Sequence, residues 1–254
     1  MPPERGRRGI GLALAVLLTC SSAGALAAEL TVSAASSLSD AFQAVLPAFE
    51  ARHPGSRVRL NLGASGVLVR QIEQGAPVDV LASADPESLD EAARLGLLRA
   101  DTRTVFASNR LVLAQARSAV ALRDLAQLQD PQVRRIALGQ PTLVPAGRYA
   151  RTALQAAGLW EALQPRYIYT QNVRQALDYL VRGEVDAAFL YASDLHARPA
   201  EVVTAFDVPD TGAIRYPVAV TARSRQPEAA AAFVAFLLDP EAQALLQQHG
   251  FRAP

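Results

Sequence analysis

The stretch 30–38, Leu-Thr-Val-Ser-Ala-Ala-Ser-Ser-Leu, is typical of a β-strand that leads directly into a helix. Its first five residues form a short β-rich run, and Ser36-Ser37 stands where the helical pattern starts. Apolar residues then recur at spacings of three and four, which predicts a helix with one apolar face. That face consists of Leu38, Ala41, Phe42, Val45, Leu46 and Phe49.

Short β-rich runs and helical runs alternate along the rest of the chain, which predicts an α/β fold. Asp85-Pro86 is typical of a helix start, with aspartate as N-cap and proline in the first turn. Pro217 lies in an extended run, which favours an edge or hinge strand. The other predicted strands are 58–62, 78–82, 110–114, 136–138, 167–169, 187–191 and 202–206, and the helices include 67–74, 122–127, 147–157, 173–181, 227–238 and 240–248.

Three further helix starts resemble the one at Ser36-Ser37. They are Gly63-Ala64-Ser65-Gly66, Val144-Pro145-Ala146-Gly147 and Gln171-Asn172-Val173-Arg174. A helix start offers unpaired backbone N–H groups and the positive end of a dipole of about half a charge. If the fold brings these starts together, they form an oxyanion cage that needs no lysine or arginine.

The N-terminal residues 1–27 have the pattern of a secretory signal. Arg5, Arg7 and Arg8 precede an apolar run, residues 10–19, that is too short to span a membrane. A small-residue pattern then predicts cleavage after Ala27 and export as a soluble periplasmic protein. Cys20 offers an alternative lipoprotein site, but Thr19 is a poor residue directly before such a cysteine.

Composition argues against several other classes of function. Removal of residues 1–27 changes the formal net charge from +1 to −1, so a nucleic-acid surface is not expected. The mature chain has no cysteine, hence neither a disulfide nor a thiol nucleophile. Val67 stands where a serine-hydrolase elbow needs its second glycine, and the three histidines lack metal-ligand spacing. We therefore expect no enzyme, no cofactor and no direct protein–metal ligand.

Several segments, in this order behind a signal sequence, resemble the periplasmic molybdate-binding proteins, the solute receptors of molybdate ABC importers. The segments span essentially the whole mature chain. They are AASSL at 34–38, RQIEQGAPVD at 70–79, ASAD at 82–85, VPAG at 144–147, NVRQAL at 172–177, YASD at 191–194 and YPVA at 216–219.

The resemblance implies a two-lobed binding protein of type II-like architecture, with a mixed sheet flanked by helices in each lobe. The chain would cross between the lobes twice, near Ser108-Asn109 and near Ala213-Ile214. Lobe 1 would comprise residues 28–108 plus 214–254, and lobe 2 residues 109–213. The ligand would lie in the cleft, at the carboxyl ends of strands.

The resemblance also implies an anion site of two serines, two backbone amides and a tyrosine hydroxyl. The matching residues are Ser37, Ser65, Ala146, Val173 and Tyr191. Up to about seven donors without an acceptor select a fully deprotonated anion, which molybdate, tungstate and sulfate all are. Molybdenum would be bound only as the oxyanion, and a monomeric receptor would deliver it to an inner-membrane ABC permease.

Other interpretations of the same residues remain open. The same architecture could bind sulfate or a small organic acid. Taken alone, Ser36, Ser37 and Ser65 would be interpreted as N-caps, and Tyr191 as a core aromatic residue. Four aspartates are interpreted as caps or loop anchors outside the site, namely Asp79, Asp85, Asp186 and Asp194.

Overall fold

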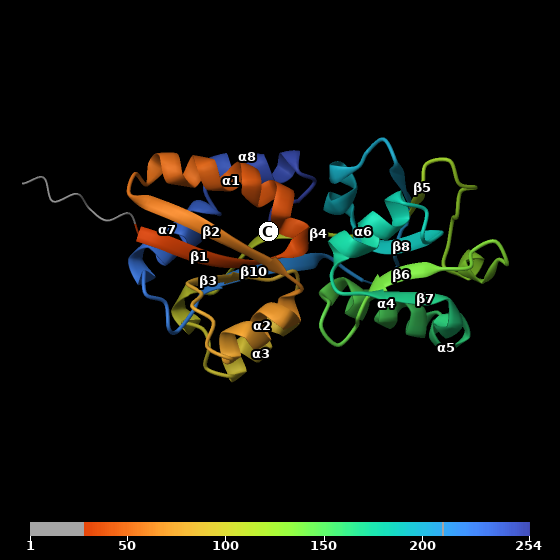
Figure 1. Cartoon of the computed structure of the whole chain (residues 1–254), viewed down its shortest axis with the longest axis horizontal. Helices are drawn as coiled ribbons and strands as arrows, with labels where there is room; N and C mark the ends of the chain where they lie inside the picture. Colours follow the sequence, from red (N-terminus) through yellow and green to blue (C-terminus); the bar gives the residue numbers. More distant parts are fainter. Residues whose placement is uncertain (1–27, 210) are drawn as a thin grey trace, which may run out of the picture.

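The computed structural model describes residues 28–209 and 211–254, so the predicted signal sequence and its cleavage point lie outside the described residues. The chain folds into two lobes, each built on a five-stranded sheet (Figure 1). In spatial order, the first sheet consists of β2 (Ser56–Gly63), β1 (Ala28–Ala35), β3 (Val80–Ala82), β10 (Ile214–Val220) and β4 (Thr104–Asn109). The second consists of β7 (Tyr167–Thr170), β6 (Ile136–Gly139), β8 (Ala187–Tyr191), β5 (Leu111–Ala116) and β9 (Val202–Asp207).

The two sheets have the same pattern of strand directions. β1 runs parallel to both of its neighbours, and β6 does the same in the second sheet. The fourth strand of each sheet, β10 or β5, is antiparallel to the strands on either side of it. The predicted α/β fold with a mixed sheet in each lobe is therefore confirmed.

The chain passes between the sheets at two places. It leaves the first sheet at Asn109 and enters the second at Leu111, and it returns between Asp207 and Ile214. Strand β4 was not predicted from the sequence, although its last residue, Asn109, pairs with Ile214 at the return crossing. Both crossings therefore lie side by side at one end of the β4–β10 pair.

Of the predicted edge or hinge strand around Pro217, the edge position is wrong, because β10 lies between β3 and β4. The strand does begin at the return crossing, at Ile214. Proline cannot donate a hydrogen bond to a neighbouring strand. The register with β4 shifts between Tyr216 and Pro217, and the proline carbonyl still accepts a hydrogen bond from the Ser83 N–H at 2.9 Å. A local irregularity thus accommodates proline inside the sheet.

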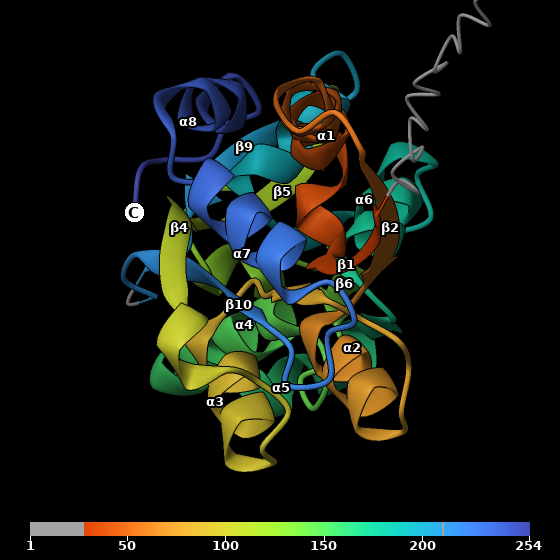
Figure 2. The same cartoon turned by 90° about the vertical axis from the view of Figure 1, so that its left-hand side faces the viewer.

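Helices cover both faces of each sheet (Figures 1 and 2). In the first lobe, α1 (Ser39–Arg52), α7 (Pro227–Phe236) and α8 (Pro240–Gln248) lie on one face, and α2 (Ser65–Glu73) and α3 (Pro86–Arg94) on the other. In the second lobe, α4 (Pro145–Ala156) and α5 (Trp160–Leu163) lie opposite α6 (Val173–Val181). No single helix in the described ranges is long and apolar enough to cross a membrane; α7 and α8 meet that test only as a pair, bent by 63°.

The apolar face predicted for the first helix packs into the core of the first lobe. Phe42 and Phe49 are fully buried, and both contact Phe233 of α7 edge-on, with ring centroids 5.9 and 5.1 Å apart. Edge-to-face aromatic pairs add about 0.5–1.5 kcal/mol beyond the burial of their area. This packing fixes α1, and with it the short 3-10 turn Ser36–Leu38 that precedes the helix.

The helix predicted over residues 122–127 is wrong. The structure has a 3-10 turn at Ala126–Gln129 instead. A helix over 122–127 would pair the Gln127 N–H with a carbonyl of its own first turn, but this N–H donates to the Asp124 side chain instead. Such local side-chain contacts compete with helix formation.

Gly147 lets α4 lie against β6. A Cβ at this position would lie 1.9 Å from the Gly139 carbonyl oxygen, which is a backbone atom that cannot move aside. The absence of a side chain thus sets the position of Ala146, one residue earlier at the start of the same helix.

We expect Gly147→Ala to lower the free energy of unfolding by about 1–3 kcal/mol or more, because the added methyl group overpacks the contact between α4 and β6. Urea unfolding of the mature protein measures this change. The matched control is Thr152→Ala on the exposed side of α4, which should change stability by no more than about 0.5 kcal/mol. Equal stability of the two variants would contradict this account of α4 packing.

Candidate functional site

The four predicted helix starts meet at one small cavity between the lobes. Five of the residues that line it are those predicted as ligands: Ser37, Ser65, Ala146, Val173 and Tyr191. The remaining lining residues are Ala35, Ser36, Gly63, Ala64, Ala84, Val144 and Pro145, so every one of the twelve is uncharged. The wall of the cavity therefore offers hydrogen-bond donors without a carboxylate.

The cavity is narrow in this closed arrangement of the lobes. Inside the cavity, the centre of a water-sized sphere can occupy a volume of about 10 Å³. This is close to the minimum needed to hold one water molecule. A tetrahedral oxyanion, with four oxygen atoms around a central atom, needs more room than one water molecule. How far the lobes close therefore sets the size of the anion that they can enclose.

The hydroxyl group of Ser37 is held by a tyrosine from the return strand. Its Oγ lies 3.0 Å from the hydroxyl of Tyr216 in β10. Burial raises the pKa of Tyr216 well above its ordinary value, so the tyrosine keeps its proton. Either of the two hydroxyls can donate in this hydrogen bond. When Tyr216 donates, the Ser37 proton is free to point into the cavity.

The hydroxyl group of Ser65 is also held by a hydrogen bond within the protein, in this case from a backbone N–H. Ser65 is the first residue of α2 and is fully buried, and its Oγ accepts a hydrogen bond from the Ala84 backbone N–H at 3.1 Å. Its hydroxyl proton is also left for an acceptor in the cavity. The reading of these serines as N-caps is wrong, because Ala35 and Ala64 occupy the N-cap positions and neither helix start has a side-chain cap.

Ala146 and Val173 contribute backbone N–H groups from the first turns of α4 and α6. N–H groups at these positions have no acceptor within their own helix, and the helix dipole makes this end positive. The Asn172 side chain caps α6 by accepting from the Gln175 N–H at 3.0 Å. The cap uses a later N–H group and leaves that of Val173 facing the cavity.

Tyr191 closes the cavity from the end of β8. Its hydroxyl donates a hydrogen bond of 3.5 Å to the Ala84 carbonyl oxygen in the other lobe, an acceptor that a bound anion would have to replace. Its ring meets Tyr216 edge-on, with centroids 5.7 Å apart. Burial raises the pKa of Tyr191 well above its ordinary value. The hydroxyl therefore keeps its proton and acts as a donor at any physiological pH.

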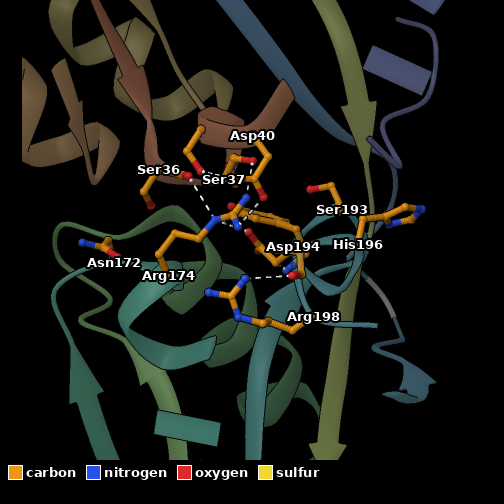
Figure 3. A network of polar contacts seen from close by, with 12 residues as sticks. Ser36, Ser37, Asp40, Asn172, Arg174, Ser193, Asp194, His196 and Arg198 are labelled. Atoms are coloured by element: carbon orange, nitrogen blue, oxygen red, sulfur yellow. Dashed lines mark hydrogen bonds and ion pairs between the residues drawn. The ribbon is translucent and has the colours of Figure 1, made fainter. Parts of the chain in front are cut away.

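Two arginines beside the cavity were not predicted from the sequence. Arg148 of α4 contacts Asp85 of the first lobe at 2.5 Å, and Arg174 of α6 contacts Asp40 at 2.8 Å (Figure 3 shows the second contact). A cation in the first turn of a helix is disfavoured by the dipole, so both arginines need a compensating partner. An arginine in the first turn of a predicted helix was therefore the sequence signal for these contacts.

The four aspartates interpreted as caps or anchors have those roles, and two of them also contact the arginines. Asp85 caps α3 by accepting from the Ser88 N–H. Asp79 and Asp186 accept hydrogen bonds from backbone N–H groups of neighbouring loops and strands. Asp194 accepts from the Tyr191 N–H at 3.0 Å and lies 3.3 Å from Arg174.

Asp194 is fully buried, and burial raises the pKa of its carboxyl group to about 6, although Arg174 and the Tyr191 N–H oppose the rise. The folded state then binds a proton more tightly than the unfolded chain, whose aspartate has a pKa of about 3.9. The contribution of Asp194 to stability therefore falls as pH rises from about 4 to about 6.

We expect the wild-type protein to lose stability relative to Asp194→Asn over this pH window. The asparagine oxygen still accepts from the Tyr191 N–H but carries no charge. Thermal unfolding of the ligand-free protein between pH 4 and pH 7 measures the difference, with the exposed Asp101→Asn as a control for loss of a surface carboxylate. Parallel profiles for the wild type and Asp194→Asn would contradict the burial argument.

The fold and the cavity together define a class: a two-lobed solute-binding protein with an uncharged, donor-rich site between its lobes. In the described residues no group of three His, Cys, Asp or Glu side chains could hold a metal ion. The chain belongs to the bacterial extracellular solute-binding protein family, whose profile matches residues 30–252.

Among its relatives is the molybdate-binding protein ModA of Escherichia coli, which is 33% identical over 254 residues and covers 96% of this chain and 98% of the relative. This confirms the resemblance predicted from the sequence. Similar solved structures include the periplasmic molybdate-binding protein of Azotobacter vinelandii (TM-score 0.79, 23% identity, 89% and 99% of the two chains). Another is the sulfate-binding protein SubI of Mycobacterium tuberculosis (TM-score 0.78, 22% identity, 89% and 87%). At these identities the two structures show the fold alone.

Proposed function

We propose that this protein captures molybdate in its interlobe cleft and delivers it to an ABC permease of the inner membrane. The observation that supports the proposal is the hydrogen bonding of the two serine hydroxyl groups. The hydroxyl of Ser65 already accepts a hydrogen bond from the Ala84 N–H, and that of Ser37 shares one with the Tyr216 hydroxyl, which can act as its donor, so both serines can offer their protons to an anion. A site made of such donors favours an oxyanion that carries no proton of its own.

The ligand set of the proposal is Ser37, Ser65, Ala146, Val173 and Tyr191, all of which line the same cavity. Ser37 and Ser65 belong to the first lobe and the other three to the second, so a bound anion bridges the lobes. We assign residues 28–108 and 214–254 to the first lobe and residues 109–213 to the second. Closure is then a hinge motion at the two crossings that depends on the anion.

The donors of the cavity distinguish among candidate anions by their protonation. Hydrogen phosphate carries a proton that needs an acceptor, and no carboxylate lines the cavity. Molybdate, tungstate and sulfate each offer four oxygen acceptors and no proton, so the number of hydrogen bonds does not distinguish them. Molybdate and tungstate have longer bonds to oxygen than sulfate has, so the extent of lobe closure distinguishes them. The identity to the molybdate-binding relative favours molybdate, with tungstate as a second ligand and sulfate as the alternative.

The cellular context follows from the family and the N-terminal sequence. A signal cleaved after Ala27 would release residues 28–254 into the periplasm as a monomer. Molybdenum is cargo in this proposal and contacts the protein only through the oxygen atoms of the anion. The protein carries no cofactor and performs no chemical step.

Thermal-shift titration of residues 28–254 with molybdate, tungstate, sulfate and phosphate tests the ligand. At a thousandfold excess over its dissociation constant, a ligand that binds only the folded state adds about 4 kcal/mol. This should raise Tm by several degrees for molybdate and tungstate. A shift with sulfate alone would keep the architecture and change the ligand, and no shift with any of the four would refute the oxyanion proposal.

We expect Ser37→Ala and Ser65→Ala each to weaken molybdate binding by about 1.5–3 kcal/mol, roughly ten- to hundredfold, because each removes a hydrogen bond to a charged group. Isothermal titration calorimetry measures the change. The matched control is Ser33→Ala, a buried serine on β1 outside the cavity, whose partner Asn61 keeps its contact with Gln71. Wild-type affinity in both site variants would exclude these serines as ligands.

A further inference from the structure

The two arginines beside the cavity connect the lobes. Arg148 reaches from α4 to the first lobe, where it contacts the Asp85 carboxylate at 2.5 Å, the Ser88 hydroxyl at 2.9 Å and the Glu87 carboxylate at 3.3 Å. Arg174 reaches from α6 to the Asp40 carboxylate at 2.8 Å and to the carbonyl oxygens of Ser36 and Ser37, each at 3.3 Å. All of these contacts cross between the lobes, so a hinge opening of the cleft would break them.

Each contact lies directly beside a proposed anion ligand. Arg174 follows Val173, and its guanidinium group holds the carbonyl of Ser37 (Figure 3). Arg148 lies two residues after Ala146, and its partner Asp85 follows Ala84, whose N–H orients the Ser65 hydroxyl. Each arginine therefore ties an amide ligand of the second lobe to a serine ligand of the first.

The charges of these pairs do not enter the cavity. Neither arginine lines it, and both side chains are about one-fifth exposed, which is less than for ordinary surface ion pairs. Asp85 is almost wholly buried, so its carboxylate depends on Arg148 for a counter-charge when the lobes close. The guanidinium groups also offset four carboxylates, Asp40, Asp85, Glu87 and Asp194, that would otherwise repel a dianion.

We propose that Arg148 and Arg174 are positioning residues that hold the lobes closed over the anion and so set the rate at which it is released. This inference rests on the proposed function. A ligand that needs the closed state binds with an apparent dissociation constant that is inversely proportional to the closed fraction. Loss of an interlobe contact lowers that fraction without removing any donor from the cavity.

The best variants remove an interlobe contact and nothing else. Asp85 caps α3, and Arg174 also faces the buried Asp194 of its own lobe, so neither is a clean choice. Arg148→Gln and Asp40→Asn each remove one side of an interlobe contact and leave these structural roles in place. Asp40 also lies in the first turn of α1, where asparagine keeps an oxygen acceptor for the Ser39 hydroxyl. The matched control is Arg182→Gln at the end of α6, where the exposed side chain pairs only weakly, at 3.9 Å, with Glu184 of the same lobe.

Stopped-flow release of molybdate and calorimetric affinity are measured for the wild type, both variants and the control, together with Tm in the absence of ligand. We expect release to be about five- to twentyfold faster in each variant and faster still in the double variant, with affinity reduced to match. Arg148→Lys, which keeps one ion pair, should give an intermediate rate. The Tm of the ligand-free protein should stay near the wild-type value, because the open lobes do not make these contacts.

The outcomes separate the two proposals. If the wild type binds molybdate but both variants release it at the wild-type rate, the positioning role is wrong and the proposed function stands. If the variants lower the Tm of the ligand-free protein as much as that of the complex, the arginine contacts are structural. If the wild type does not bind molybdate at all, the proposed function fails and this inference fails with it.

Discussion

Buried hydrogen-bond donors that lack an acceptor are the constraint on which this structure depends. Four helix starts meet between the lobes, and the N–H groups of their first turns cannot be paired within their own helices. Two serine hydroxyls line the same cavity, and each is held by one hydrogen bond within the protein. An unpaired buried donor costs about 1–3 kcal/mol, so full closure is favourable when an acceptor lies among these donors. An oxyanion provides such acceptors on every side.

Charge is arranged around the cavity and not inside it. The sequence contains no lysine, so all 25 of its basic side chains are arginine. The planar guanidinium group makes several hydrogen bonds at once, and Arg174 uses this to contact a carboxylate and two carbonyl oxygens in the opposite lobe. Neutral donors thus contact the anion, while ion pairs next to them bring the lobes together. Recognition and closure are therefore carried by different residues on the same two helices.

The sequence predicted the parts of the site that depend on local patterns. The run at 173–181 predicted α6 at its observed bounds, and the strand at 187–191 placed Tyr191 at the end of β8. Non-local contacts could not be predicted in this way. Pro217 lies inside a sheet because a register shift and the Ser83 N–H accommodate it. The contacts of Arg148 and Arg174 join residues more than 60 and 130 positions apart, so only the closed fold reveals them.

The central claim is that one anion bridges both lobes through neutral donors. Diffraction from crystals of the mature protein grown with molybdate, recorded at the molybdenum absorption edge, tests this claim most directly. The account predicts a single anomalous peak in the cavity, with anion oxygens within hydrogen-bond distance of Ser37, Ser65, Ala146, Val173 and Tyr191. A peak elsewhere, or molybdenum coordinated directly by a carboxylate, would contradict it.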